Sequence, residues 1–107
     1  MFSMANFLLA YTGGGMPATE AEGQAAMAAW GAWFGGLGAA VVDGGNPCSG
    51  SKTVASNGTV SDGAAGMITG YSVLKADNLD AAAKMAQGCP ILASGGSVQV
   101  YETFNAM

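Results

Sequence analysis

The side chains that could carry out chemistry in this chain are few, because it contains seven acidic residues, three lysines, no arginine and no histidine. The groups suited to general acid–base work are carboxylates and phenols, namely Asp43, Asp62, Glu102, Tyr11, Tyr71 and Tyr101. We take Asp62, Tyr71 and Asp43 as candidate catalytic residues, since a carboxylate can accept a proton and a phenol can donate one. Each of these residues could instead have a purely structural role. Either aspartate could accept a hydrogen bond from its own backbone in a glycine turn, and the tyrosine could pack at an interface.

The absence of histidine excludes several kinds of site. A Ser-His-Asp or Cys-His relay is impossible, and so is a zinc site that uses imidazole. Cys48 and Cys89 with scattered carboxylates form a poor metal set, so we expect no metal. The glycine-rich segments match neither a Walker loop nor the dinucleotide-binding pattern, so we expect no cofactor.

Aromatic residues supply the candidate ligand-binding side chains, which are Trp33, Tyr11 and Tyr101. Apolar residues spaced by three and four along one predicted helix face are Met27, Trp30, Phe34 and Leu37. We interpret this stripe as core packing. Trp33 lies on its flank, where it could pack in the core, contact a partner subunit or form a pocket wall.

Composition limits the class of protein. The chain has 107 residues, and we expect a single domain over residues 1–107. Its net charge of −4, with no basic stripe, argues against binding to nucleic acid or to an anionic membrane surface. No segment is long and apolar enough for a membrane span or resembles a signal peptide, and two cysteines do not make a disulfide scaffold. We therefore expect a cytoplasmic protein with both thiols reduced.

The order of the predicted elements gives the fold class. The elements we expect, in order, are strand Phe2–Tyr11, a break at Gly13-Gly14-Gly15, a helix with Pro17 in its first turn and Thr19 near its start, strand Ala39–Asp43, a hairpin about Asn57-Gly58, strand Ile68–Ala76, a helix capped by Asp77 and ended by a left-handed Gly88, and strand Ser97–Thr103. Two β-α-β halves predict an α+β ferredoxin-like sandwich, an antiparallel sheet with two helices on one face. The other face is left bare. Because the first strand is apolar on both sides and only 9% of residues are charged, we expect a homodimer through that face.

A set of short motifs resembles the YCII-related family, in particular its DGPF branch. The matching motifs, in order along nearly the whole chain, are Trp30-Gly31-Ala32-Trp33, Asp43-Gly44-Gly45-Asn46-Pro47, Asp62-Gly63, Gly70-Tyr71, Asp77-Asn78-Leu79-Asp80, Gly88-Cys89-Pro90 and Gly95-Gly96-Ser97-Val98. The resemblance implies a dimeric α+β barrel, in which two subunits pack sheet against sheet. The wider superfamily includes muconolactone isomerases and small monooxygenases, while DGPF-type proteins are often encoded beside sigma factors.

The chain departs from the family pattern at two points. Ala64-Ala65 stands where the DGPF motif has Pro-Phe, and the proposed histidine of the YCII-like His/Asp site has no counterpart. Asp62 matches the first half of the motif and is for that reason the first choice among the candidate acids.

Two functions remain open from the sequence. One is a homodimeric protein that binds a small molecule in a pocket beside the sheet, with cofactor-free catalysis by Asp62 and a tyrosine as an option. The other is a non-catalytic dimeric module with a regulatory or scaffolding role. A deep pocket holding a buried carboxylate of raised pKa would favour the first.

Overall fold

The computed structural model describes residues 5–14, 18–63 and 67–105 of the chain. Its regular elements are β1 (Ala5–Thr12), α1 (Glu20–Leu37), a 3₁₀ turn η1 (Gly38–Ala40), β2 (Val41–Asp43), β3 (Lys52–Val54), β4 (Val60–Asp62), β5 (Gly70–Ala76), α2 (Leu79–Ala86), a second 3₁₀ turn η2 (Pro90–Ser94) and β6 (Ser97–Glu102). The expected parts at Phe2–Met4, Gly15, Pro17 and Ala64-Ala65 lie outside the described residues.

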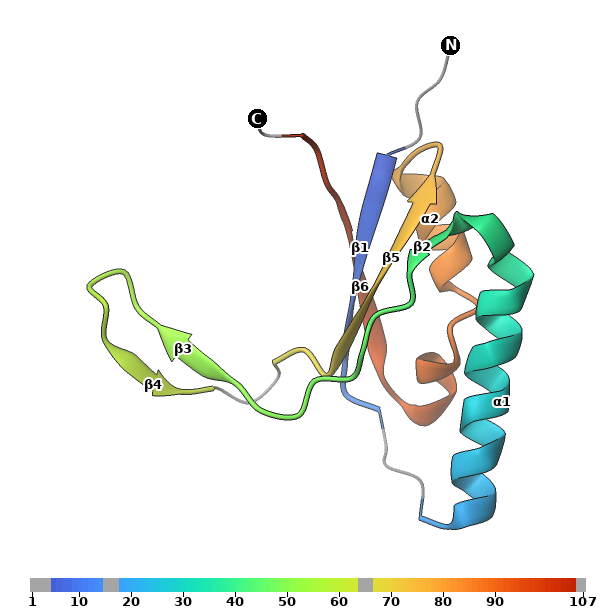
Figure 1. Cartoon of the computed structure of the whole chain (residues 1–107), viewed down its shortest axis with the longest axis horizontal. Helices are drawn as coiled ribbons and strands as arrows, with labels where there is room; N and C mark the ends of the chain where they lie inside the picture. Colours follow the sequence, from blue (N-terminus) through green and yellow to red (C-terminus); the bar gives the residue numbers. More distant parts are fainter. Residues whose placement is uncertain (1–4, 15–17, 64–66, 106–107) are drawn as a thin grey trace.

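The main sheet has the order β2-β5-β1-β6, and every neighbouring pair is antiparallel. Its two central strands, β1 and β5, come from the two β-α-β halves of the chain. Figure 1 shows both α-helices on the same side of this sheet. The predicted ferredoxin-like α+β fold is thereby confirmed, with a separate two-stranded hairpin, β3–β4, inserted between the halves.

The core lies between the sheet and the helices and is built by strand alternation. The alternating side chains Phe7, Leu9 and Tyr11 of β1 face the helices and are buried, and Ala10 on the other face of the strand is buried as well. On β5 the buried set includes Leu74 and Ala76, and α2 covers them with Ala82 and Ala86. Small alanine side chains let α2 approach the sheet closely, so the core is thin.

Helix α1 is attached differently, because none of its residues is fully buried. It starts with a reciprocal cap: the Glu22 N–H donates to Thr19 Oγ1 at 3.1 Å, and the Ala18 N–H donates to Glu22 Oε2 at 2.8 Å. Trp30 and Leu37 of the predicted stripe pack partly against the core, and so does Trp33 on the flank of the stripe. Met27 does not, since 77% of it is exposed.

Helix α2 begins one residue later than the sequence predicted. The cap is Asn78, whose side-chain oxygen accepts the Ala81 N–H at 2.8 Å, and not Asp77. The two residue types cap about equally well, so their order alone could not decide between them. At the other end Gly88 does not take the predicted left-handed conformation. Its missing side chain instead leaves room for the Trp33 ring, which a Cβ atom would approach to 3.2 Å.

The outer face of the sheet, away from the helices, carries the alternate residues of the same strands. Leu8 lies opposite Val73 on one side and Tyr101 on the other, so an apolar row crosses three strands. Polar side chains flank this row at Asn6 and Gln99. No α-helix in the described part of the chain covers this face.

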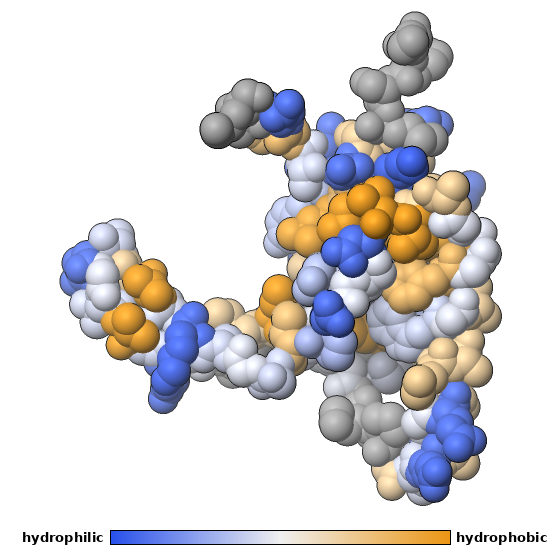
Figure 2. Space-filling view, in the orientation of Figure 1, coloured by the Kyte–Doolittle hydropathy of each residue, from blue (hydrophilic) through white to orange (hydrophobic). Residues whose placement is uncertain are grey.

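The hairpin formed by β3 and β4, here called the arm (residues 52–62), projects away from the sheet on the side opposite the helices (Figure 1). The predicted turn at Asn57-Gly58 is confirmed, with the Ala55 N–H donating to the Thr59 carbonyl at 2.8 Å. All residues of both arm strands are exposed. Figure 2 shows open space between the arm and the body of the protein.

The corrected helix cap gives a first prediction. Asn78→Ala should lower the free energy of unfolding by about 1 kcal/mol, because the Ala81 N–H loses its acceptor. Asp77→Ala is the matched control and should have a smaller effect. Urea denaturation of the two variants measures the difference, and an equal loss in both would contradict the assignment of the cap.

Candidate functional site

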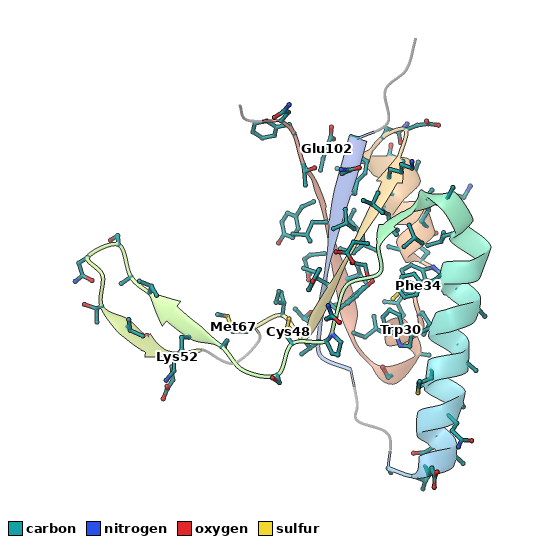
Figure 3. The ribbon with its side chains drawn as sticks, viewed as in Figure 1. Trp30, Phe34, Cys48, Lys52, Met67 and Glu102 are labelled. Carbon is teal, nitrogen blue, oxygen red and sulfur yellow. The ribbon has the colours of Figure 1, made fainter. Side chains whose placement is uncertain are left out.

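A pocket of about 570 Å³ lies between α1 and the adjoining ends of the central strands. Its described lining residues are Tyr11, Met27, Trp30, Phe34, Gly44, Gly45, Asn46, Pro47, Thr69, Gly70, Tyr71 and Ile91. In Figure 3, Trp30 and Phe34 extend from α1 toward the strands. The pocket is thus assembled from one helix, two strand ends and the loop that follows β2.

Aromatic rings form one wall of this pocket. The Tyr11 and Trp30 rings meet edge to face, with centroids 5.2 Å apart and planes at 74°. Trp30 and Phe34 lie 5.9 Å apart with their planes inclined by 37°. Such contacts add about 0.5–1.5 kcal/mol per pair beyond burial, so the wall is held by its own rings as well as by the core.

A chain of hydrogen bonds fixes the opposite wall. The Tyr11 hydroxyl donates to Ser72 Oγ at 2.7 Å, and the Ser72 hydroxyl donates to the Gly44 carbonyl at 2.7 Å. Ser72 is completely buried, and both hydrogen bonds of its hydroxyl are made within the chain. These two hydrogen bonds in series tie the loop after β2 to the two central strands.

The same loop requires glycine at position 45. Gly45 has a φ of 75°, and a Cβ atom there would overlap the Tyr71 carbonyl oxygen. The Gly45 N–H donates to Asp43 Oδ1 at 2.8 Å, which closes the turn. Asp43 therefore holds a turn at the edge of the pocket, the structural alternative given for it above.

Burial keeps protonated two ionisable groups of the core, Tyr11, which lines the pocket, and Cys89, which does not. It raises the pKa of Tyr11 to about 12, against a smaller lowering by the Ser72 hydrogen bond and with a further rise from Cys89. Burial likewise raises the pKa of the Cys89 thiol. At neutral pH the Tyr11 hydroxyl is a hydrogen-bond donor and not a base, and Cys89 is not a thiolate nucleophile.

The structure separates the candidate residues taken from the sequence. Tyr11 and Tyr71 line the pocket, and Asp43 adjoins it. Asp62 lies on the arm, with its carboxylate 2.6 Å from the Lys52 ammonium and mostly exposed. Tyr101 is 54% exposed and belongs to the outer face.

Trp33 stands apart from this pocket. Its indole N–H donates to the Met85 carbonyl at 3.1 Å, and its ring meets that of Trp30 edge to face at 5.8 Å. It therefore joins α1 to α2. The side chains that sequence reasoning missed as pocket walls are Trp30 and Phe34, which it assigned to the core stripe.

Comparison with protein families gives one match. A family model described as the YCII-related domain matches residues 8–105, which include every residue that lines the pocket and the whole arm. The chain belongs to the YCII-related family. Comparison with curated proteins and with solved structures gave no significant match.

Three further observations bear on this YCII-related domain. Within residues 5–14, 18–63 and 67–105, no three His, Cys, Asp or Glu side chains lie close enough together to hold a metal ion. Over the same ranges, no helix combines the length and apolar character needed to cross a bilayer. Cys48 is exposed and Cys89 is buried, and neither forms a disulfide.

The buried phenol leads to a prediction about pH. The folded-state pKa of Tyr11, about 12, lies above its ordinary value of 10.0, so unfolding releases a proton between these pH values. The stabilisation is complete below pH 10 and is lost as the pH rises toward 12. At about 1.4 kcal/mol per pKa unit it is of the order of 3 kcal/mol.

Tyr11→Phe keeps the ring but removes this titration. Urea denaturation between pH 9 and 11 should show a shallower fall in stability for Tyr11→Phe than for the wild type. Equal slopes for the two proteins would contradict the role given to Tyr11.

Proposed function

We propose that this YCII-related protein binds a small, neutral and mainly apolar molecule in the pocket beside α1. The observation that carries the proposal is the aromatic-walled pocket of about 570 Å³. Binding sites for small molecules typically have about 300–1,000 Å³, apolar and aromatic walls and a few polar groups. The wall formed by Tyr11, Trp30 and Phe34 suits a planar ring.

The charge of the lining supports a neutral ligand. No described residue that lines the pocket is acidic or basic. A ligand carrying a formal charge would lose its water without gaining an opposite charge, which costs several kcal/mol. Polar groups at Asn46 and Thr69 can orient a hydroxyl or carbonyl on the ligand.

The positions of the acidic residues support binding without catalysis. Asp62 is on the arm and paired with Lys52, outside the pocket. The Asp43 carboxylate accepts a hydrogen bond from the Gly45 backbone. The raised pKa of Tyr11 keeps its hydroxyl protonated, and that proton is donated to Ser72 Oγ, so the phenol is not free to abstract a proton from a ligand.

A homodimer through the outer sheet face is part of the same proposal. The row formed by Val73, Leu8 and Tyr101 presents apolar side chains that no described helix covers. A two-fold axis would pair this row with its own copy and remove it from water. The scarcity of charge, at 9% of residues, supports the same arrangement.

We also propose that, within the YCII-related family, this protein belongs to the DGPF branch. This assignment is supported by Asp62-Gly63 and by Gly88-Cys89-Pro90, where Gly88 makes room for Trp33 and Pro90 opens η2. A ligand-binding dimer without catalytic machinery also fits the regulatory setting that this branch implies.

The pocket can be tested with indole as the probe, compared with its charged relative indole-3-acetate. Indole should shift the backbone amide signals of Gly44, Gly45 and Gly70 in NMR spectra of labelled protein, because these amides line the pocket. Indole-3-acetate should shift them less at equal concentration, since the lining offers no cation to its carboxylate.

A variant that fills the pocket makes this test specific. Met27→Trp places a large ring at the pocket mouth, and Met27 is mostly exposed, so the fold should tolerate it. It should weaken indole binding at least tenfold. Gln24→Trp, exposed on the same helix but outside the lining, is the control and should bind as the wild type does. Equal binding by both variants would contradict the proposed site.

The homodimer gives a separate prediction. Sedimentation equilibrium at low micromolar concentration should find twice the chain mass, and the melting temperature should rise with protein concentration. Tyr101→Lys should shift the protein toward the monomer, because it places a charge in the apolar row. A folded wild-type protein at the single-chain mass would rule out this part of the proposal.

A further inference from the structure

The arm has one apolar face that nothing in the described chain covers. Val54 and Val60 lie directly opposite each other across its two strands and are 67% and 61% exposed. By strand alternation the Lys52–Asp62 ion pair lies on the same face, whereas Thr53 and Ser61 occupy the other face. One face is therefore apolar with a neutralised pair of charges, and the other is polar.

Such a hairpin is too small to be stable by itself. Each of its strands has three residues, and isolated two-stranded hairpins are at best marginally stable in water. Its ion pair is exposed and contributes about 0–1 kcal/mol. Among the described elements, each arm strand makes its extensive contacts with the other arm strand. Within the described residues, the valine pair therefore has no packing partner beyond the arm itself.

A contact by the arm would enlarge the interface of the proposed homodimer. Four strands about 4.8 Å apart, with about six residues each at about 3.3 Å, give a flat footprint of roughly 400 Å². A standard interface buries about 800 Å² of accessible surface per partner, a measure that projecting side chains make larger than the flat footprint of the same patch, so the sheet alone gives a small interface. Part of the face is polar, at Asn6, Lys75 and Gln99, so its apolar area is smaller still.

We propose that the arm clasps a second copy of this chain, with Val54 and Val60 packed against the partner subunit beside its outer sheet face. The arm projects from the body on the side of that face, and the open space between them faces outward (Figures 1 and 2). A two-fold axis through the sheet faces brings each arm toward the other subunit. This inference rests on the proposed homodimer and adds the arm to the contact area of the sheet face.

A pair of matched double variants tests the clasp. Val54→Lys with Val60→Lys places two charges on the apolar face, and Thr53→Lys with Ser61→Lys places them on the polar face. Both variants change the net charge from −4 to −2 and create one cross-strand lysine pair, so general repulsion and strand pairing are affected equally. Neither set of positions belongs to the core, so both variants should fold.

The expected result is a difference in association between the two variants. By sedimentation equilibrium, the valine variant should have a dimer dissociation constant at least tenfold above that of the wild type, and the polar-face variant should stay close to the wild type. Amide hydrogen exchange in residues 52–62 of the wild type should also slow as protein concentration rises. Circular dichroism checks that each variant is folded.

The other outcomes separate the clasp from the proposal on which it rests. If the valine variant dimerises like the polar-face variant while Tyr101→Lys dissociates, the clasp is wrong and the sheet-face dimer stands. If the wild type is a monomer, the clasp and the sheet-face dimer are both wrong. The proposed binding of indole in the pocket does not depend on that result. Dissociation by the valine variant alone would support the clasp and place the main contact on the arm.

Discussion

Two hydrogen bonds in series, from the Tyr11 hydroxyl to Ser72 and from Ser72 to the Gly44 carbonyl, determine where the rest of the site can lie. They join the two central strands to the loop after β2 in the dry interior, where an unpaired hydroxyl would be destabilising by about 1–3 kcal/mol. The pocket follows from this constraint. The loop is held against the sheet on one side, the Tyr11 ring supports Trp30 on the other, and the space between them remains open.

Much of the fold could be predicted because it depends on local patterns. Alternation in β1 and β5, the turn at Asn57-Gly58 and the repeated β-α-β order are visible within short windows. The places where the sequence-based prediction of the fold was wrong also have local causes. Asp77 and Asn78 are equally good caps, and only the path of the chain out of β5 selects the second.

The site was harder to predict because its parts are distant in the sequence. Tyr11 and Ser72 are 61 positions apart, and their contact depends on strand register. Trp30 and Phe34 have the spacing of core residues, and nothing in that spacing shows that their outer edges face a cavity. Asp62 was chosen for its motif, but its neighbour in space is Lys52 across the hairpin, which explains the aspartate as a cross-strand partner.

The shallow attachment of α1 affects how the interior exchanges with solvent. None of its 18 residues is fully buried, and its contact with the rest of the molecule rests largely on a few aromatic rings and one indole hydrogen bond. An element of this kind belongs to the cooperative units that open before the global transition, while the sheet and α2 remain folded. Because α1 forms one side of a pocket that is already open to solvent, the same opening widens the space beside the strand ends and loosens the aromatic wall.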